Sequence, residues 1–211
     1  MKNFFLCVAL LCAINIFAQN LNKDTIQLKE IVVRSQKSKP KIKKFSYRSN
    51  HTLLENLEYS VDEAITLVDK LPAGWLHSVT FKFNTASTDK YVAYDYKDTQ
   101  LELLFYEVNP DNTPGNPIVH EKKIITVSGD FSGKMEIGLA NLNIKSDGKI
   151  FIGLKRLNKS GSDTREFEVD CLYAYEPNYK YISFSRQDST LPWKLSTMIA
   201  AFRMDVKVEA D

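Results

Sequence analysis

The sequence predicts an all-β protein: a jelly-roll-like antiparallel β-sandwich of about nine strands, preceded by a signal peptide and a basic linker. Three observations lead to this prediction. The N-terminus has the order of an export signal, the body shows repeated two-residue alternation of apolar and polar residues, and turn-forming clusters separate the alternating stretches. Many short strands without helices between them favour two antiparallel sheets packed face to face.

The first 18 residues are expected to be a cleaved signal peptide. Lys2 is followed by an apolar run from Phe4 to Phe17, which ends at Ala18. Charge, apolar stretch and small residue are the features that export machinery recognises. The run is shorter than the roughly 20 residues that cross a bilayer as a helix. We therefore expect an exported protein, in the periplasm or at the outer membrane or cell surface, without a transmembrane span.

Cys12 raises the alternative of a lipid anchor. Leu11 precedes it where a lipid-attachment signal requires a small residue, and the apolar run continues past it, so cleavage is favoured. Cleavage would remove Cys7 and Cys12 and leave Cys171 without a partner for an internal disulfide. Stability must then come from a packed core.

Residues 19–48 are expected to form a strand-like segment and a basic linker ahead of a β-sandwich domain at 49–211. Seven basic residues and no acid lie between Arg34 and Arg48, whereas residues 49–211 hold 18 basic and 24 acidic residues, a net charge of 18 − 24 = −6. Such a segment predicts a solvated, self-repelling linker. Contact with an acidic membrane surface, glycan or partner stays open as an alternative, while export argues against nucleic acid.

The body alternates as half-buried strands do. Val79, Phe81 and Phe83 alternate with polar residues, as do Phe202, Met204, Val206 and Val208. Further strands are expected at Glu63–Val68, Gln100–Val108, Lys123–Val127, Lys134–Leu139, Lys149–Lys155, Glu168–Tyr175 and Tyr179–Ser185. Clusters rich in Gly, Asn, Asp and Pro separate them, as tight turns require. A helix over Leu53–Val68, where apolar residues recur every three to four positions, is the alternative there.

The body carries a set of motifs: Tyr106 and Val108, Pro114 and Gly115, the F-x-G-L motif of Phe151, Gly153 and Leu154, and Trp193. Together they resemble those of exported Bacteroidetes β-sandwich proteins labelled carboxypeptidase-like regulatory domain-containing. The resemblance covers roughly Leu53 to Val208 and implies a sandwich fold and an exported location. It implies no enzymatic activity, because its motifs are structural.

A second resemblance concerns the N-terminal segment. DTIQLKEIVVRS (Asp24 to Ser35) is similar to the segment that leads into the plug of TonB-dependent outer-membrane receptors. Such a peptide can add a strand to the exposed edge of a partner's sheet. Ile26, Leu28, Ile31 and Val33 are therefore candidate partner-binding residues, with an envelope or outer-membrane protein as the partner; an ordinary first strand of the sandwich is the alternative.

Aromatic residues supply the candidate ligand-binding surface. A flat ring can cover the apolar face of a sugar while polar neighbours bind its hydroxyls. The candidates are Tyr173, Tyr175, Tyr179, Tyr181 and Trp193. Tyrosine is also a favoured strand residue, so packing within the sandwich is the competing explanation.

Catalytic and metal motifs are absent from the sequence. His51, His77 and His120 stand apart, and Cys171 lies in an alternating stretch that predicts a buried thiol. Calcium could use the acidic loops at Asp95 and Asp98 or at Asn109–Asn112, and a jelly-roll glycosidase could use Glu166, Glu168 and Asp170, but turns and a solvated strand face explain these residues more simply. We expect no metal, no cofactor and no enzymatic activity.

The sequence thus predicts a non-catalytic cell-envelope accessory or protein-interaction module. A carbohydrate-binding or adhesion domain that uses surface Tyr and Trp is the alternative.

Overall fold

β-strands make up nearly all of the regular structure. The computed structural model describes residues 41–47, 51–53, 61–84, 95–119, 121–157, 166–168, 170–171, 173–175, 181–196 and 200–210. Within these ranges lie eighteen strands and one short 3₁₀ turn, η2 (Ala140–Leu142). Several strands are only two or three residues long, so their number exceeds the nine expected. The all-β prediction is confirmed.

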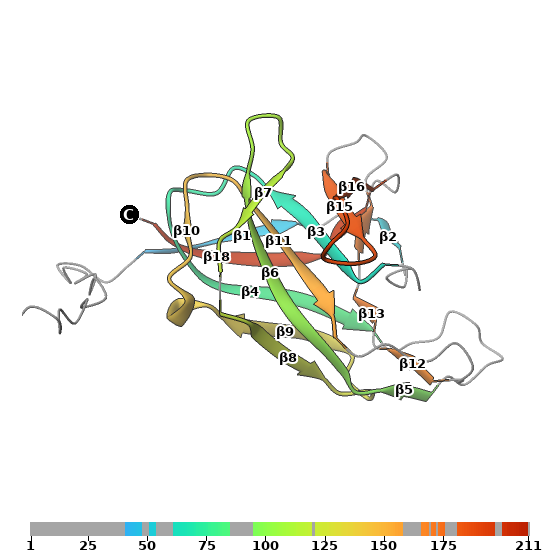
Figure 1. The fold of residues 1–211 in the computed structure, drawn as a ribbon. Coiled ribbons are helices and arrows are strands. Elements are labelled where there is room, and N and C mark those ends of the chain that lie inside the picture. The colour runs from blue at the N-terminus through green and yellow to red at the C-terminus, as the bar shows by residue number, and fades with distance from the viewer. Residues whose placement is uncertain are drawn as a thin grey trace, which may run out of the picture. The chain divides into compact units, whose positions relative to one another are not determined.

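Two antiparallel sheets carry most of the strands, and we call them sheet I and sheet II (Figure 1). Sheet I has the order β1–β18–β4–β10, with β9 and β13 also pairing with β4. Its strands are β1 (Ile42–Tyr47), β18 (Met204–Ala210), β4 (Gly74–Asn84), β10 (Lys145–Ser146), β9 (Gly133–Gly138) and β13 (Asp170–Cys171).

Sheet II has the order β16–β15–β3–β11–β6–β7, with β8 also pairing with β6. Its strands are β16 (Lys194–Leu195), β15 (Ser183–Arg186), β3 (Glu63–Val68), β11 (Ile150–Arg156), β6 (Thr99–Val108), β7 (Pro114–Pro117) and β8 (Lys123–Val127). Two smaller sheets complete the description. One is β17 (Ala200–Phe202), β14 (Tyr173–Tyr175) and β2 (His51–Leu53), and the other is the parallel pair β5 (Asp95–Lys97) and β12 (Glu166–Glu168).

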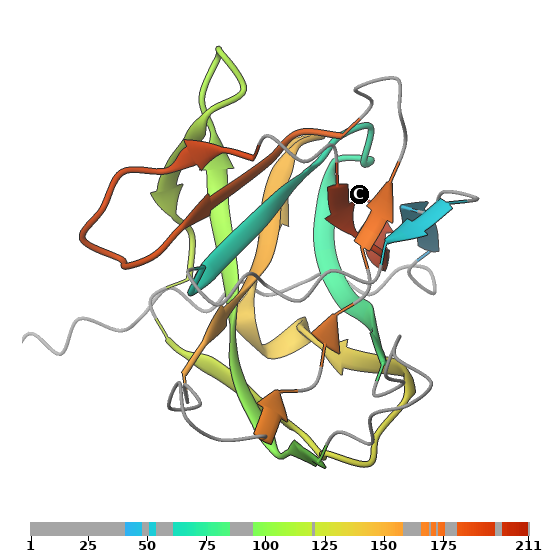
Figure 2. The ribbon, with the colours of Figure 1, turned by 90° about the vertical axis from the view of Figure 1, so that its right-hand side faces the viewer.

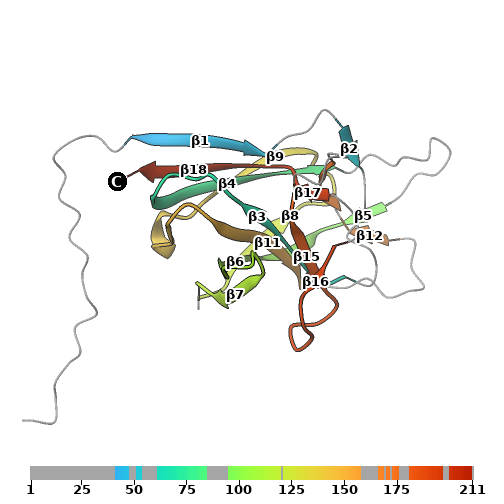
Figure 3. The ribbon, with the colours of Figure 1, turned by 90° about the horizontal axis from the view of Figure 1, so that it is seen from above.

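The main core lies between sheets I and II, which form two layers in Figure 3. Alternation along each strand sends one set of side chains inward: Leu76, Val79, Phe81 and Phe83 of β4 are at most 2% exposed. The ring of Phe81 meets that of Phe202 edge to face, with centroids 5.6 Å apart. The alternating pattern in the sequence therefore marks the core-facing side of the strands correctly.

Strand β1 occupies part of the segment that the sequence predicts to be a linker. Residues 42–47 pair along their whole length with β18, and Phe45 packs against the main core. The sheet thus begins before residue 49, inside the basic stretch. The two other expected segments, 1–18 and the candidate peptide with Ile26, Leu28, Ile31 and Val33, lie outside the described residues.

The helix that was the alternative for Leu53–Val68 is not present in its described part, because Glu63–Val68 is strand β3. In the ranges listed above, no helix has the length and apolarity needed to cross a membrane.

Candidate functional site

A row of alternating charges crosses the outer face of sheet II, the face turned away from sheet I. The register places Arg186 of β15 opposite Glu63 of β3, Glu63 opposite Lys155 of β11, and Lys155 opposite Glu102 of β6. Lys122 extends the row, with its Nζ 3.8 Å from a carboxylate oxygen of Glu102. Opposite charges on directly paired residues stabilise a sheet.

Glu63 is the centre of this row. Its side chain is 1% exposed, and the guanidinium of Arg186 donates from Nε (2.6 Å) and Nη2 (2.5 Å) to Oε2. The ammonium of Lys155 lies 2.9 Å from Oε1. A buried carboxylate that lost one of these cations would keep an uncompensated charge, which is costly. The ion pairs of Glu63 therefore link β3 to its neighbours β15 and β11.

Two aromatic rings enclose the guanidinium of Arg186. Its Cζ lies 4.1 Å from the ring centroid of Trp193 and its Nη2 donates to the hydroxyl oxygen of Tyr106 at 3.0 Å. The two rings meet edge to face with centroids 5.3 Å apart. This links the β15–β16 hairpin to β6, and Figure 2 shows the red hairpin reaching toward the green β6–β7 hairpin. Cation–π and aromatic contacts of this kind fix the hairpin on the sheet.

A second apolar cluster lies beside the charged row on the same face. It consists of the buried side chains Ile65, Leu67, Leu104, Phe151 and Phe184, with Trp193 and Tyr106 among those packed against it. Gly153, opposite both Ile65 and Leu104, adds no side chain to this face. A Cβ there would collide with the carbonyl oxygen of Ala64 and lie 2.6 Å from Cα of Ile65. The Gly of the F-x-G-L motif is thus required by close backbone approach.

Two groups in this cluster have raised pKa values. The hydrogen bond from Lys155 to Glu63 raises the pKa of the Lys155 ammonium above its usual 10.5, against the opposing effect of burial. Burial raises the pKa of the Tyr106 hydroxyl above 10.0, although nearby Arg186 acts in the opposite direction. Both groups therefore stay protonated throughout the neutral range.

The edge of sheet II beside this cluster is apolar and exposed. Leu195 of β16 lies opposite Phe184, so it continues the apolar cluster to the end of the sheet, yet it is 61% exposed. Leu191, in the turn of the same hairpin, is 43% exposed. In the described sheet β16 pairs with β15 alone, which leaves its other edge without a neighbouring strand.

The aromatic residues that the sequence suggests do not form one surface. Trp193 joins the cluster described above, but Tyr181 is only 9% exposed and packs with Ala201, so its ring has little surface for a ligand. Tyr173 and Tyr175 belong to β14, where the first pairs with Phe202 and Leu53 and the second with Ala200 and His51. Tyr179 lies outside the described residues.

The sequence does not identify Arg186, Glu63 and Tyr106 as partners. Tyr106 and Trp193 occur among the family-like motifs, and the structure brings them into contact. Arg186 and Glu63 are separated by 123 positions, and only the strand register joins them.

The acidic loops are occupied by turn hydrogen bonds. Asp98 Oδ1 accepts from the Gly129 amide at 2.9 Å, and Asp111 Oδ1 accepts from the Thr113 hydroxyl at 2.6 Å. The latter bond lowers the pKa of Asp111. Among the residues with described positions, no group of three or more His, Cys, Asp or Glu side chains is arranged to hold a metal ion. Cys171, Glu166, Glu168 and Asp170 occupy the short strands β12 and β13.

Comparison with known proteins gives little further information. No protein-family model matches the sequence, and no curated protein matches it. Two solved structures are similar to this chain. One is the clostridial cysteine protease Cwp84 after propeptide cleavage, at 15% identity and a TM-score of 0.49, covering 82% of this chain and 42% of that one. The other comprises the cysteine protease and lectin-like domains of Cwp84, a surface layer associated protein of Clostridium difficile, at 16% identity and a TM-score of 0.48, covering 82% and 37%. The chain thus spans less than half the length of either protein, and likenesses this distant do not assign a function.

Proposed function

We propose that the chain is a non-catalytic binding module of the cell envelope that holds a protein partner at its β15–β16 hairpin. The observation that best supports this proposal is the exposure of Leu191 and Leu195 on this one hairpin. They are two of the four large apolar side chains that are exposed among the described residues. Exposed apolar groups gathered at one place on a soluble domain are typical of a protein-interaction site.

The neighbouring contacts support this proposal because they hold the hairpin in one conformation. Trp193 lies between the two leucines in the sequence and packs on Arg186, whose charge is neutralised by Glu63. A hairpin that is already ordered loses little conformational entropy when a partner binds. The unpaired edge of β16 could in addition accept an extended strand from the partner.

The sequence supports the cellular context. The predicted signal at residues 1–18 would export the chain, and the resemblance to exported Bacteroidetes sandwich proteins agrees with that location. The N-terminal peptide with Ile26, Leu28, Ile31 and Val33 would provide a second point of attachment to an outer-membrane protein.

Site-specific crosslinking in the native envelope tests the proposal. A photoreactive amino acid in place of Leu195 should give one discrete crosslinked product, while the same group in place of Ile124, which is 50% exposed on β8, should give none. With the photoreactive group at the exposed Lys194 of the same hairpin, the chain should again give the product, and the added substitutions Leu191→Lys and Leu195→Lys should abolish it without a fall in Tm. Equal crosslinking from both positions, or an unchanged product in the double variant, would contradict the proposal.

A further inference from the structure

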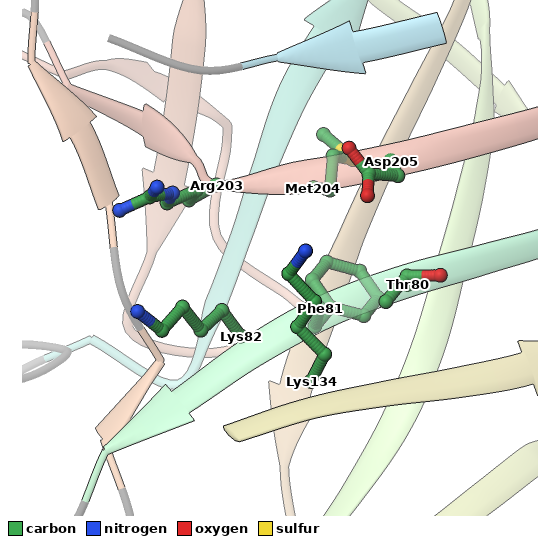
Figure 4. Close-up of a pocket in the computed structure, with 7 residues that line it drawn as sticks. All are labelled: Thr80, Phe81, Lys82, Lys134, Arg203, Met204 and Asp205. Carbon is green, nitrogen blue, oxygen red and sulfur yellow. The ribbon is translucent and has the colours of Figure 1, made fainter. Parts of the chain in front are cut away.

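Three cations stand in line on the outer face of sheet I. Lys82 of β4 lies directly opposite Lys134 of β9. Arg203 precedes β18 by one residue, and the pairing of Met204 with Phe81 places it beside Lys82 on the other side. Figure 4 shows the three side chains around one shallow depression, with Lys82 and Arg203 extending in the same direction and the Lys134 amine between β4 and β18. The rest of the lining consists of Thr80, Phe81, Met204 and Asp205.

This arrangement is unfavourable for the isolated domain. Directly opposed side chains on paired strands have Cβ atoms about 5 Å apart, and like charges at that separation destabilise the sheet. Neither Lys82 nor Lys134 forms an ion pair with another residue in the part of the chain that the structure describes. Two directly opposed lysines without an ion pair among the described residues are best explained by a ligand that supplies the opposite charge.

The nearby acids are engaged by other cations. Asp205, the one carboxylate in the depression, is bound by Lys44, with Nζ 3.0 Å from Oδ2. Glu136 accepts from Lys207 at 2.7 Å and from the Ser78 hydroxyl at 2.6 Å, and these bonds lower its pKa. Both carboxylates are therefore already paired with a lysine, Asp205 with Lys44 and Glu136 with Lys207.

The positive charge extends over the whole described face. Strand position turns six cations outward from sheet I, Lys44, Lys82, Lys134, Lys145, Arg203 and Lys207, against the acids Glu136, Asp205 and Glu209, and Asp170 holds a further outward register position opposite Asn84. By contrast, residues 40–211 as a whole contain 22 basic and 24 acidic residues, a net of 22 − 24 = −2. Positive charge is thus concentrated on this face, which raises the local concentration of anions.

We propose that this face binds an acidic polysaccharide, with Lys82, Lys134 and Arg203 contacting its carboxylate or sulfate groups. A flat sheet surface with cations repeating from strand to strand fits an extended polymer with repeated anionic groups. Trp75 lies on the same outward face further along β4, opposite Lys145, and can contribute a ring for sugar stacking. Membrane docking usually adds several inserted apolar groups to the cations. Among the described residues, Ile42, opposite Glu209, is the one large exposed apolar side chain on sheet I, whereas Ile124, Leu191 and Leu195 belong to sheet II or its hairpin.

The site is independent of the proposed partner site on the hairpin, because the two lie on different sheets. Binding of the full mature chain to dextran sulfate, polygalacturonate and neutral dextran tests it, with inorganic phosphate, phosphatidylglycerol vesicles and double-stranded DNA in parallel. We expect binding to the two acidic polysaccharides, weakening steeply with added salt because exposed charges are screened, and no binding to neutral dextran.

Two charge-matched variants give the decisive comparison. Lys82→Gln/Lys134→Gln should weaken binding to the acidic polysaccharides by about tenfold or more, since two charge-assisted contacts are lost. Lys122→Gln/Lys149→Gln removes the same charge from exposed positions off this face and should change binding by no more than about twofold. The Lys82/Lys134 variant should also fold with an unchanged or higher Tm, because repulsion is relieved.

Three results would overturn the proposal. Equal weakening in both variants would mean that only net charge matters. Stronger binding to vesicles or to DNA than to either polysaccharide would assign the face to another ligand. A lack of binding to both acidic polysaccharides at low salt would leave the cation row without this role, while the crosslinking result for the hairpin would be unaffected.

Discussion

The outer faces of the two sheets use charge in opposite ways. On sheet II, Arg186, Glu63, Lys155 and Glu102 alternate in sign across four strands, and the β15–β16 hairpin and its Trp193 pack against the cluster. On sheet I, Arg203, Lys82 and Lys134 have the same sign and line a depression in the surface. The same row geometry therefore stabilises one face and leaves the other ready for an anion. Alternating charges on neighbouring strands stabilise the sheet, whereas like charges favour the binding of an oppositely charged ligand.

Removing a cation from the sheet II row should have the largest effect. We expect Arg186→Met to lower the free energy of unfolding by about 3 kcal/mol or more, because Glu63 stays buried with incomplete compensation and Trp193 loses its contact. Urea unfolding of the purified chain measures this. The double variant Glu63→Leu/Arg186→Met should recover most of the loss, and a double variant as unstable as the single one would show that the pair itself is not the cause.

Adding one methyl group to the same face should be the next most damaging change. Gly153→Ala is expected to cost about 2–3 kcal/mol, because its Cβ meets the backbone of Ala64 and Ile65 and β3 must shift away from β11. Gly138, whose Cβ would meet nothing within 4 Å, provides the matched control, and Gly138→Ala should be close to neutral. Similar costs at both glycines would contradict the role of close approach.

Alkaline titration should weaken the sheet II cluster only above the usual pKa values of its Lys and Tyr side chains. The pKa values of Lys155 and Tyr106 are raised above 10.5 and 10.0 in the folded chain, so both groups favour folding while they are protonated. Their contribution is complete below about pH 10 and is lost as pH rises through the folded values. We expect the urea midpoint to decrease once the pH exceeds 10. The difference in tyrosinate absorbance between wild type and Tyr106→Phe reports the ionisation of Tyr106, and we expect it to appear above pH 10. If this absorbance difference appeared below pH 10, the pKa of Tyr106 would be lowered in the folded chain, which would contradict the prediction.

An exposed pair on sheet I should matter least. Lys207→Met removes the ion pair with Glu136, whose side chain is 48% exposed, and we expect a loss of only about 0.2–1 kcal/mol that shrinks further in high salt. Thermal unfolding at low and high salt checks this. A loss as large as that of Arg186→Met would mean that the two faces are not different in kind.

Local patterns in the sequence predict the strands well. Glu63–Val68 and Lys123–Val127 coincide with β3 and β8, because alternation and flanking turns are encoded within each segment. The pattern within strand β1 does not predict a strand, since its lysines suggest a solvated linker, although Phe45 packs against the core. The contact of Glu63 with Arg186 and the alignment of Lys82 with Lys134 depend on pairing between distant strands. Periodicity within a segment carries no information about that register.

The position of β18 in sheet I has a consequence for how the domain folds. It lies between β1 and β4, although its residues, 204–210, follow those of every other described strand. Neither β1 nor β4 can acquire this central neighbour until nearly the whole described chain has left the ribosome. Pairing between such distant segments slows folding, so sheet I is expected to be completed late.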